Sequence, residues 1–199
     1  MDDVLVVVAF HSGHGHTARQ AAAVAEGAGG TPGARAELVD VSEVDDAGWA
    51  LLDAADAIVF GSPTHMGTRS AVFQAFAEAT AGIWAQGRWR DKLAAGFTNS
   101  AGVNGDKLAT LTSLVVFAAQ HGMTWVPLGL PPGWLFTANG SPTDLNRLGG
   151  FLGALAQSPS DVGPEHAPPD SDLRTAAHLG GRVALAARRV AAGRALVGA

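Results

Sequence analysis

Short apolar runs alternate with segments of helical periodicity along most of the chain. The apolar runs predict strands over residues 4–10, 36–41, 57–61, 93–97 and 123–127. Their consecutive apolar residues are typical of parallel strands that helices cover on both faces. The periodic segments predict helices over residues 17–27, 42–54, 69–80, 105–120 and 172–193. This alternation predicts an α/β fold: a doubly wound five-stranded parallel sheet with helices on both faces.

One stretch, over residues 128–169, interrupts the alternation. It holds many of the chain's 10 prolines, and it is longer than an ordinary connection. Apolar residues such as Trp134, Phe136 and Phe151 could anchor it. We therefore expect an ordered excursion that passes over the ligand mouth or enters a subunit contact, within a single domain spanning residues 1–199.

Composition narrows the class of protein. Hydrophobic residues make up 47% and charged residues 16% of the 199 residues, which indicates a globular chain with a substantial core. The net charge of -5 argues against nucleic acid as a partner. The sequence has no apolar run long enough to span a bilayer and no basic start typical of a signal peptide, so we expect a cytoplasmic protein with no membrane span.

Two residue types are missing from the sequence. The absence of cysteine excludes disulfides, thiolate catalysis and cysteine-ligated iron–sulfur clusters. The absence of tyrosine excludes a short-chain dehydrogenase with a catalytic Tyr, and also a flavin site shielded by Tyr. Any aromatic stacking on a ring must therefore come from Trp, Phe or His.

The first predicted strand ends in a loop of glycine and hydroxyl residues, from Ser12 to Thr17, which opens the first predicted helix. The first turn of a helix has unpaired N–H groups and a partial positive charge, so it attracts a phosphate. Gly13 and Gly15 allow close approach of the backbone, and the two hydroxyls add donors. No Lys or Arg lies inside this loop, so neutral donors would hold the phosphate.

This loop leaves three interpretations open. Residues 13–18 also match the dinucleotide-binding pattern G-x-G-x-x-G/A, with Asp40 as the acidic residue for a ribose. An ordinary capped turn between a strand and a helix is the second interpretation. The hydroxyls at both ends of the loop favour the third, a pocket for the phosphate of FMN.

Two further loops, over residues 62–68 and 98–105, follow predicted strands. Ligands of doubly wound sheets bind outside the carboxyl ends of the strands, where the strand order reverses. Pro63 stiffens the second loop and Gly67 permits a positive φ there. The third loop consists of small residues beside Asn99, whose side chain could bind the edge of a flavin.

The ordered set of these motifs resembles the flavodoxin-like NAD(P)H:quinone oxidoreductases of WrbA type and their relatives, the NADPH-dependent FMN reductases. The resemblance covers residues 1–129. Its matching pieces are Ser12-x-x-Gly15-His16, Pro63-Thr64-x-x-Gly67, Gly82-Ile83-Trp84-Ala85-x-Gly87, Lys92-Leu93-Ala94, the loop over residues 100–105, and His121-Gly122-Met123 followed by Val126-Pro127-x-Gly129. The resemblance implies a flavodoxin-like sheet, FMN as the cofactor and NADH or NADPH as the electron donor.

The resemblance also implies residue roles. The FMN phosphate would be held by Ser12, Gly15, His16 and Thr17. The isoalloxazine would be flanked by Pro63, Thr64, His65, Met66, Gly67 and Thr68. Its other edge and the ribityl chain would contact Ser100, Ala101, Gly102, Asn104 and Gly105, with Asn99 beside them. Trp84 and His121 are the candidate catalytic residues, lining the space where nicotinamide and acceptor react. An Arg common in the family's second loop is His65 in this chain.

Simpler interpretations stand beside some of these roles. Trp84 could be a core or interface residue, and His121 could cap the C-terminus of a helix, where a cation is favourable. His11, His14 and His16 match no standard metal-binding spacing, and no carboxylate lies in their loop, so we expect no metal site.

The leading functional hypothesis is an FMN-dependent enzyme that passes two electrons from NAD(P)H to a small quinone-like acceptor. Hydride would reach flavin N5, and the nicotinamide would leave before the acceptor enters, which is a ping-pong mechanism. The alternative is an FMN-binding electron-carrier module that serves a protein partner, and a domain with bound NAD is a third hypothesis. Apolar side chains such as Trp84 and Trp89, together with the family resemblance, predict a homodimer or homotetramer whose subunits complete each other's active sites.

Overall fold

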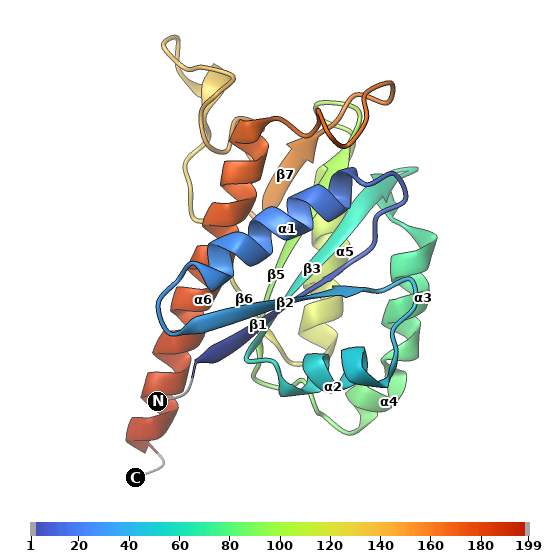
Figure 1. Cartoon of the computed structure of the whole chain (residues 1–199), viewed down its shortest axis with the longest axis vertical. Helices are drawn as coiled ribbons and strands as arrows, with labels where there is room; N and C mark the ends of the chain where they lie inside the picture. Colours follow the sequence, from blue (N-terminus) through green and yellow to red (C-terminus); the bar gives the residue numbers. More distant parts are fainter. Residues whose placement is uncertain (1–2, 198–199) are drawn as a thin grey trace.

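The computed structural model describes residues 3–197, and a parallel sheet forms its centre. The strands of this sheet follow the order β2-β1-β3-β5-β6. They are β1 (Val4–Phe10), β2 (Ala34–Asp40), β3 (Ala57–His65), β5 (Leu93–Ser100) and β6 (Thr124–Trp125). All four neighbouring pairs are parallel. The predicted fold class is confirmed, and Figure 1 shows helices on both faces of the sheet.

Each face of the sheet is covered by its own set of helices. Val4, Val6 and Val8 of β1 face α1 (His16–Gly29) and α6 (Asp170–Val197). The alternate residues of β1 face the opposite layer, because successive side chains of a strand point to opposite sides. That layer consists of α2 (Asp46–Ala54), α3 (Ala71–Ala79), α4 (Ala81–Ala85) and α5 (Lys107–Gln120).

Close backbone contact joins α1 to α6 on the first face. A Cβ added at Gly27 would lie 1.9 Å from the carbonyl oxygen of Ala177, and one added at Gly180 would lie 1.9 Å from that of Val24. Glycine is therefore required at both positions, since no side chain fits between the two helices. The N-terminal and C-terminal parts of the chain are packed together along this contact (Figure 1).

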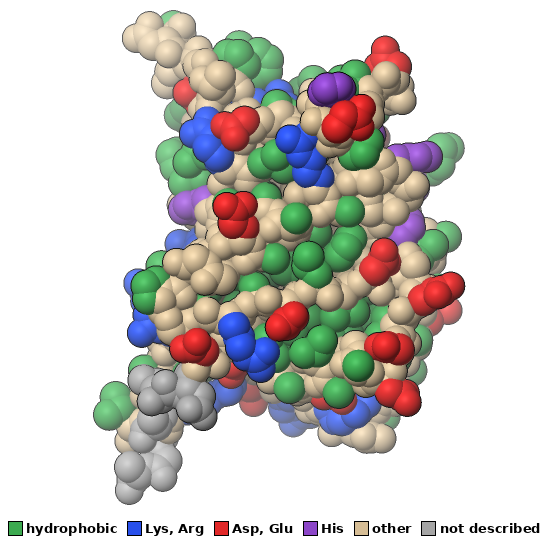
Figure 2. Space-filling view, viewed as in Figure 1, with side chains coloured by type: hydrophobic (Ala, Val, Ile, Leu, Met, Phe, Trp, Pro, Cys, Tyr) green, Lys and Arg blue, Asp and Glu red, His purple; other side chains and the backbone are tan. Residues whose placement is uncertain are grey.

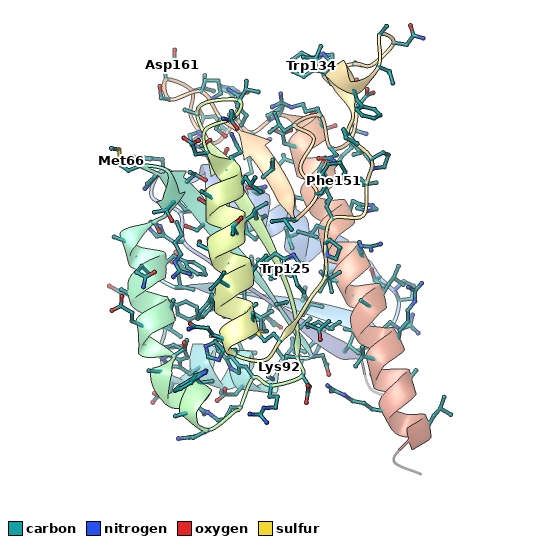
Figure 3. All side chains as sticks on the ribbon, turned by 180° about the vertical axis from the view of Figure 1, so that it is seen from behind. Met66, Lys92, Trp125, Trp134, Phe151 and Asp161 are labelled. Atoms are coloured by element: carbon teal, nitrogen blue, oxygen red, sulfur yellow. The ribbon has the colours of Figure 1, made fainter. Side chains whose placement is uncertain are left out.

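The fifth position of the sheet is shared by two short strands. β6 pairs with Leu93 and Ala94 of β5, whereas β7 (Ala154–Gln157) pairs with residues 97–100 of the same strand. The chain leaves the sheet between them and carries a single 3-10 turn, η1 (Trp134–Phe136). Figure 3 shows Trp134 near the outer end of this excursion and Phe151 closer to the sheet. The sequence predicted the excursion but placed its end at residue 169, so it missed β7.

Several predicted boundaries are also corrected by the structure. The third strand continues to His65 and pairs there with the short antiparallel strand β4 (Thr68–Arg69). The second helix begins at Asp46, because the side chain of Asp45 accepts a hydrogen bond from the Gly48 N–H and caps it. The third helix begins at Ala71, because Ser70 caps it through the Phe73 N–H.

The surface of the molecule is mixed in character. On the face shown in Figure 2, acidic and basic side chains are interspersed among apolar ones. Over residues 3–197, none of the helices combines the length and the apolar character needed to cross a membrane.

Candidate functional site

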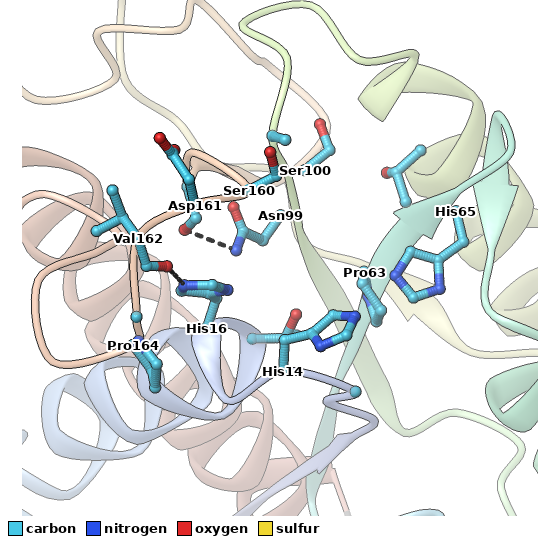
Figure 4. Close-up of a pocket in the computed structure, with 16 residues that line it drawn as sticks. His14, His16, Pro63, His65, Asn99, Ser100, Ser160, Asp161, Val162 and Pro164 are labelled. Atoms are coloured by element: carbon cyan, nitrogen blue, oxygen red, sulfur yellow. Dashed lines mark hydrogen bonds between the residues drawn. The ribbon is translucent and has the colours of Figure 1, made fainter.

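A cavity of about 560 Å³ lies at the carboxyl ends of β1, β3, β5 and β7. This is the edge at which doubly wound sheets bind their ligands. Figure 4 shows side chains from four separate segments around it. The lining residues are Gly13, His14, His16, Thr17, Pro63, Thr64, His65, Asn99, Ser100, Ala101, Ser158, Ser160, Asp161, Val162, Gly163 and Pro164.

The first wall is the loop between β1 and α1. Gly15 has a φ of 85° and precedes the first turn of α1, which no side chain caps within the described chain. The N–H groups of that turn have no partners inside the helix. The Ser12 hydroxyl oxygen is buried and has no hydrogen-bond partner among the described residues, and Thr17 lines the cavity beside it. Together these groups form a set of neutral donors suited to an anion.

The second wall is the end of β3, where Pro63, Thr64 and His65 line the cavity. The Thr64 hydroxyl lies 2.9 Å from that of Thr98 and 2.8 Å from that of Thr110, so this residue is tied to both β5 and α5. The chain then turns sharply. Met66 is fully exposed, and Figure 3 shows it at the outer edge of the molecule.

A buried histidine connects the first two walls. His11 Nδ1 lies 2.8 Å from the Ser70 hydroxyl oxygen, and the His11 N–H donates to the Gly61 carbonyl at 3.0 Å. Burial lowers the pKa of His11 from its usual 6.5, so the neutral imidazole is favoured. Sequence reasoning did not assign His11 to the site; its contacts make it a support for both loops.

The third wall is the end of β5. Asn99 is buried, and its amide nitrogen lies 2.9 Å from the Ser158 hydroxyl (Figure 4). Its side-chain oxygen has no partner in the described part of the chain. Ser100 and Ala101 follow at the cavity rim.

The fourth wall, over residues 158–164, was absent from the predicted site. His16 Nε2 lies 2.8 Å from the Val162 carbonyl oxygen, and Arg19 donates to the Pro164 carbonyl at 2.8 Å. Pro164 also lies against Gly15, where an added Cβ would be 2.8 Å from the ring. This segment follows β7, so recognition of that strand would have placed it among the ligand loops by the rule used for the other three.

The structure brings together half of the predicted cofactor-binding residues. Those that line the cavity are His16, Thr17, Pro63, Thr64, His65, Asn99, Ser100 and Ala101. Those that lie in the same loops without lining it are Ser12, Gly15, Met66, Gly67, Thr68, Gly102, Asn104 and Gly105. Their roles toward a cofactor stay predictions.

Trp84 and His121 lie away from the cavity. Trp84 is on α4 with 59% of its surface exposed, and it does not line the cavity. His121 ends α5 and is buried, with Nε2 2.9 Å from the Thr80 hydroxyl and its ring 4.7 Å from that of Trp89. Burial lowers the pKa of His121, which favours the neutral ring. Because α5 runs antiparallel to the strands, its end lies at the sheet edge opposite the cavity, and a catalytic role for either residue depends on a neighbouring subunit.

The charge around the cavity is unusual for an anion site. Asp161 is the one carboxylate that lines it, and the lining residues in the described chain include no Lys or Arg. Three imidazoles, those of His14, His16 and His65, line it instead. Figure 2 shows histidine side chains near this end of the molecule.

A parallel sheet between two layers of helices, in the strand order β2-β1-β3-β5-β6 and with a cavity at its carboxyl edge, defines a flavodoxin-like protein. Comparison with known proteins specifies the family. The model of the NADPH-dependent FMN reductases matches residues 3–130, and the chain belongs to that family. The family implies FMN as cofactor and NAD(P)H as electron donor, and the protein is an oxidoreductase of this flavodoxin-like class.

Individual relatives carry different names. Flavodoxin FldP of Pseudomonas aeruginosa is 45% identical over 181 residues, which are 89% of this chain and 94% of the relative. An NAD(P)H dehydrogenase (quinone) of Chromohalobacter salexigens is 35% identical over 144 residues, covering 63% of this chain and 71% of the relative. The crystal structure of a WrbA-like flavodoxin from Agrobacterium tumefaciens is 42% identical with a TM-score of 0.74, covering 94% and 99% of the two chains.

Proposed function

We propose that this protein transfers two electrons from NAD(P)H to a quinone-like acceptor through FMN held in the cavity. The observation that carries the proposal is the uncapped first turn of α1, where His16 and Thr17 line the cavity; the Ser12 hydroxyl precedes it in the same loop, buried and without a partner in the described chain. Such donors fit a terminal phosphate. The volume of about 560 Å³ is within the usual range for small-molecule sites, about 300–1,000 Å³.

The residues of the four walls would divide the binding of FMN among them. Ser12, His16 and Thr17 would hold the phosphate, and the ends of β3 and β5 would hold the ring and the ribityl chain. The unpaired Asn99 oxygen supports this assignment, because it can accept a hydrogen bond from a hydroxyl or a ring N–H. The chemistry that FMN would supply in this site is acceptance of a hydride from NAD(P)H and transfer of two electrons to the acceptor.

The protein's own contribution is to position the ring and to offer one space to two reactants in turn. The Thr98–Thr64–Thr110 hydroxyl chain and the His11–Ser70 contact hold two of the walls, so the site is preorganised. The donor and the acceptor would enter this one cavity in turn, which is the ping-pong order.

An FMN-binding electron carrier is the second candidate, and two observations favour it. The relative that is 45% identical is named a flavodoxin. No Trp or Phe of the described chain lines the cavity, so within one chain the aromatic rings available to stack on a bound flavin are the smaller imidazoles. A carrier would deliver electrons to a protein partner at the exposed cavity mouth.

Steady-state kinetics distinguishes the two candidates. NADPH and NADH oxidation are measured on the FMN-loaded protein, with and without benzoquinone, at several fixed concentrations of each reactant. The enzyme hypothesis expects benzoquinone-dependent turnover with parallel lines in double-reciprocal plots. Absence of turnover with both nucleotides, from protein that carries FMN, would leave the carrier as the function.

A further inference from the structure

Lys107 is the first residue of α5, and it is almost completely buried, with 1% of its surface exposed. Its ammonium donates hydrogen bonds to the carbonyl oxygens of Gly102 and Val103, the latter at 3.1 Å. The Gln157 side chain donates to the preceding carbonyl, that of Ala101, at 2.9 Å. Three consecutive carbonyls of the loop are therefore bound by two side chains.

This arrangement determines how the loop presents its backbone. The C=O and the N–H of a trans peptide unit point in opposite directions. Because the three carbonyls point toward Lys107 and Gln157, the N–H groups of Gly102, Val103 and Asn104 point away from them. Ala101 lines the cavity, so the carbonyls that Lys107 binds, those of Gly102 and Val103, belong to the loop that continues directly from the third wall.

The charge of Lys107 is not cancelled by its neighbours. Arg147 Nε lies 2.7 Å from Asp172 Oδ1, and its Nη2 lies 2.8 Å from Oδ2, so this pair is bidentate. Asp172 also accepts a hydrogen bond from the Gln157 N–H at 2.9 Å. The buried group of Lys107, Arg147 and Asp172 thus holds two cations and one anion. Burial lowers the pKa of Lys107 to about 8, and most molecules still carry the ammonium at pH 7.

A positive charge beside this loop has a specific effect on a flavin. Hydride transfer adds two electrons and one proton to FMN, so the reduced cofactor carries one more negative charge than the oxidised one. In a medium of effective dielectric constant about 20, two unit charges about 10 Å apart change a binding constant by roughly an order of magnitude. A buried cation therefore favours reduced over oxidised FMN, and the cavity lining described above supplies no Lys or Arg that could do so instead.

We propose that Lys107 is a positioning residue that orders the loop over residues 101–103 and, through its charge, stabilises reduced FMN. The inference rests on the proposed FMN site. Lys107 does not line the cavity, and the inference is that it nevertheless controls the reduction potential of the cofactor.

The test is the two-electron midpoint potential of bound FMN in Lys107→Gln, which removes the charge and keeps a donor for the loop carbonyls. We expect reduced FMN to bind about tenfold more weakly relative to oxidised FMN, which lowers the potential by about 30 mV. Lys107→Arg keeps the charge and should keep the potential near that of the wild type.

Lys92 provides a matched control. Its ammonium also donates to two carbonyls, those of Asp53 and Ala55, each at 2.6 Å, and burial also lowers its pKa. Figure 3 shows it at the opposite end of the molecule from Asp161 of the cavity. Lys92→Gln should leave the potential unchanged. An equal shift in Lys92→Gln and Lys107→Gln, or none in Lys107→Gln, overturns the inference.

A second measurement covers the case in which Lys107→Gln does not retain FMN. The potentials of the wild type and Lys107→Arg are compared at pH 7 and pH 9.5. We expect similar values at pH 7 and a lower wild-type value at pH 9.5, where Lys107 has lost its proton and an Arg has not. Equal values at both pH values overturn the inference. A wild-type protein that binds no FMN instead refutes the proposed function itself.

Discussion

Replacing Ser12 by alanine should change stability and cofactor affinity in opposite directions. The Ser12 hydroxyl oxygen is buried without a hydrogen-bond partner in the described chain. An unsatisfied buried group of this kind costs about 1–3 kcal/mol. Ser12→Ala should therefore raise the free energy of unfolding of the apo-protein by about 1 kcal/mol or more, because the penalty is removed and little packing is lost.

The same substitution should weaken FMN binding. A hydrogen bond to a charged group is worth about 1.5–3 kcal/mol, which corresponds to roughly 10- to 150-fold in the dissociation constant. Adding Thr17→Val should weaken FMN binding further, since Thr17 lines the cavity in the same loop. Urea unfolding of the apo-protein measures the stability, and quenching of FMN fluorescence during titration measures the affinity.

Ser70→Ala serves as the control. The Ser70 oxygen lies 2.8 Å from His11 Nδ1 and accepts from the Phe73 N–H at 3.2 Å, so its loss should destabilise the apo-protein by about 0.5–2 kcal/mol. If Ser12→Ala also destabilises the apo-protein, or if it leaves FMN affinity unchanged, the assignment of this hydroxyl to the phosphate is wrong.

Three further predictions concern the cofactor, pH and assembly. The apo-protein should bind FMN at least tenfold more tightly than FAD in flavin titrations, because residues 162–164 lie over the start of α1 and close the phosphate end; equal affinities would contradict this. The free energy of unfolding should fall as the pH decreases below 6.5. Burial lowers the pKa of His11 and His121 in the folded state, so the unfolded chain takes up protons first. A free energy of unfolding, measured with urea, that stays constant between pH 7.5 and 5.5 would refute this. The wild type should sediment as a homodimer or homotetramer at micromolar concentration, and Trp84→Ala should weaken that assembly because Trp84 is 59% exposed; a wild-type species of 20.2 kDa alone would refute it.

The architecture was predictable because its signals are local. Each of the buried strands β1, β3 and β5 has an apolar run, and three of the four cavity walls follow directly from those runs. The predicted loops therefore lie at the sheet edge that holds the cavity, which Thr64 and Asn99 line, and their roles toward a flavin stay predictions.

The parts that were missed depend on contacts between distant segments. β7 has only four residues, and its sequence of Ala154, Leu155, Ala156 and Gln157 indicates neither a strand nor a helix by itself. Its pairing with β5 makes this segment a strand. Because that pairing could not be foreseen, neither could the fourth wall, which follows the strand. The buried state of Lys107 was equally hidden, because it depends on carbonyls of its own loop and on charges 40 and 65 residues further along the chain.

The division of the fifth position between β6 and β7 has a consequence for synthesis on the ribosome. The walls built from β1, β3 and β5 are translated first, whereas β7, the loop that follows it, and α6 emerge later. Nascent chains that stop before residue 154 therefore lack the segment that lies on Gly15 and His16. Flavin binding should thus begin only after β7 has been synthesised and has paired with β5. The cofactor would then join a nearly complete chain and would not guide its early folding.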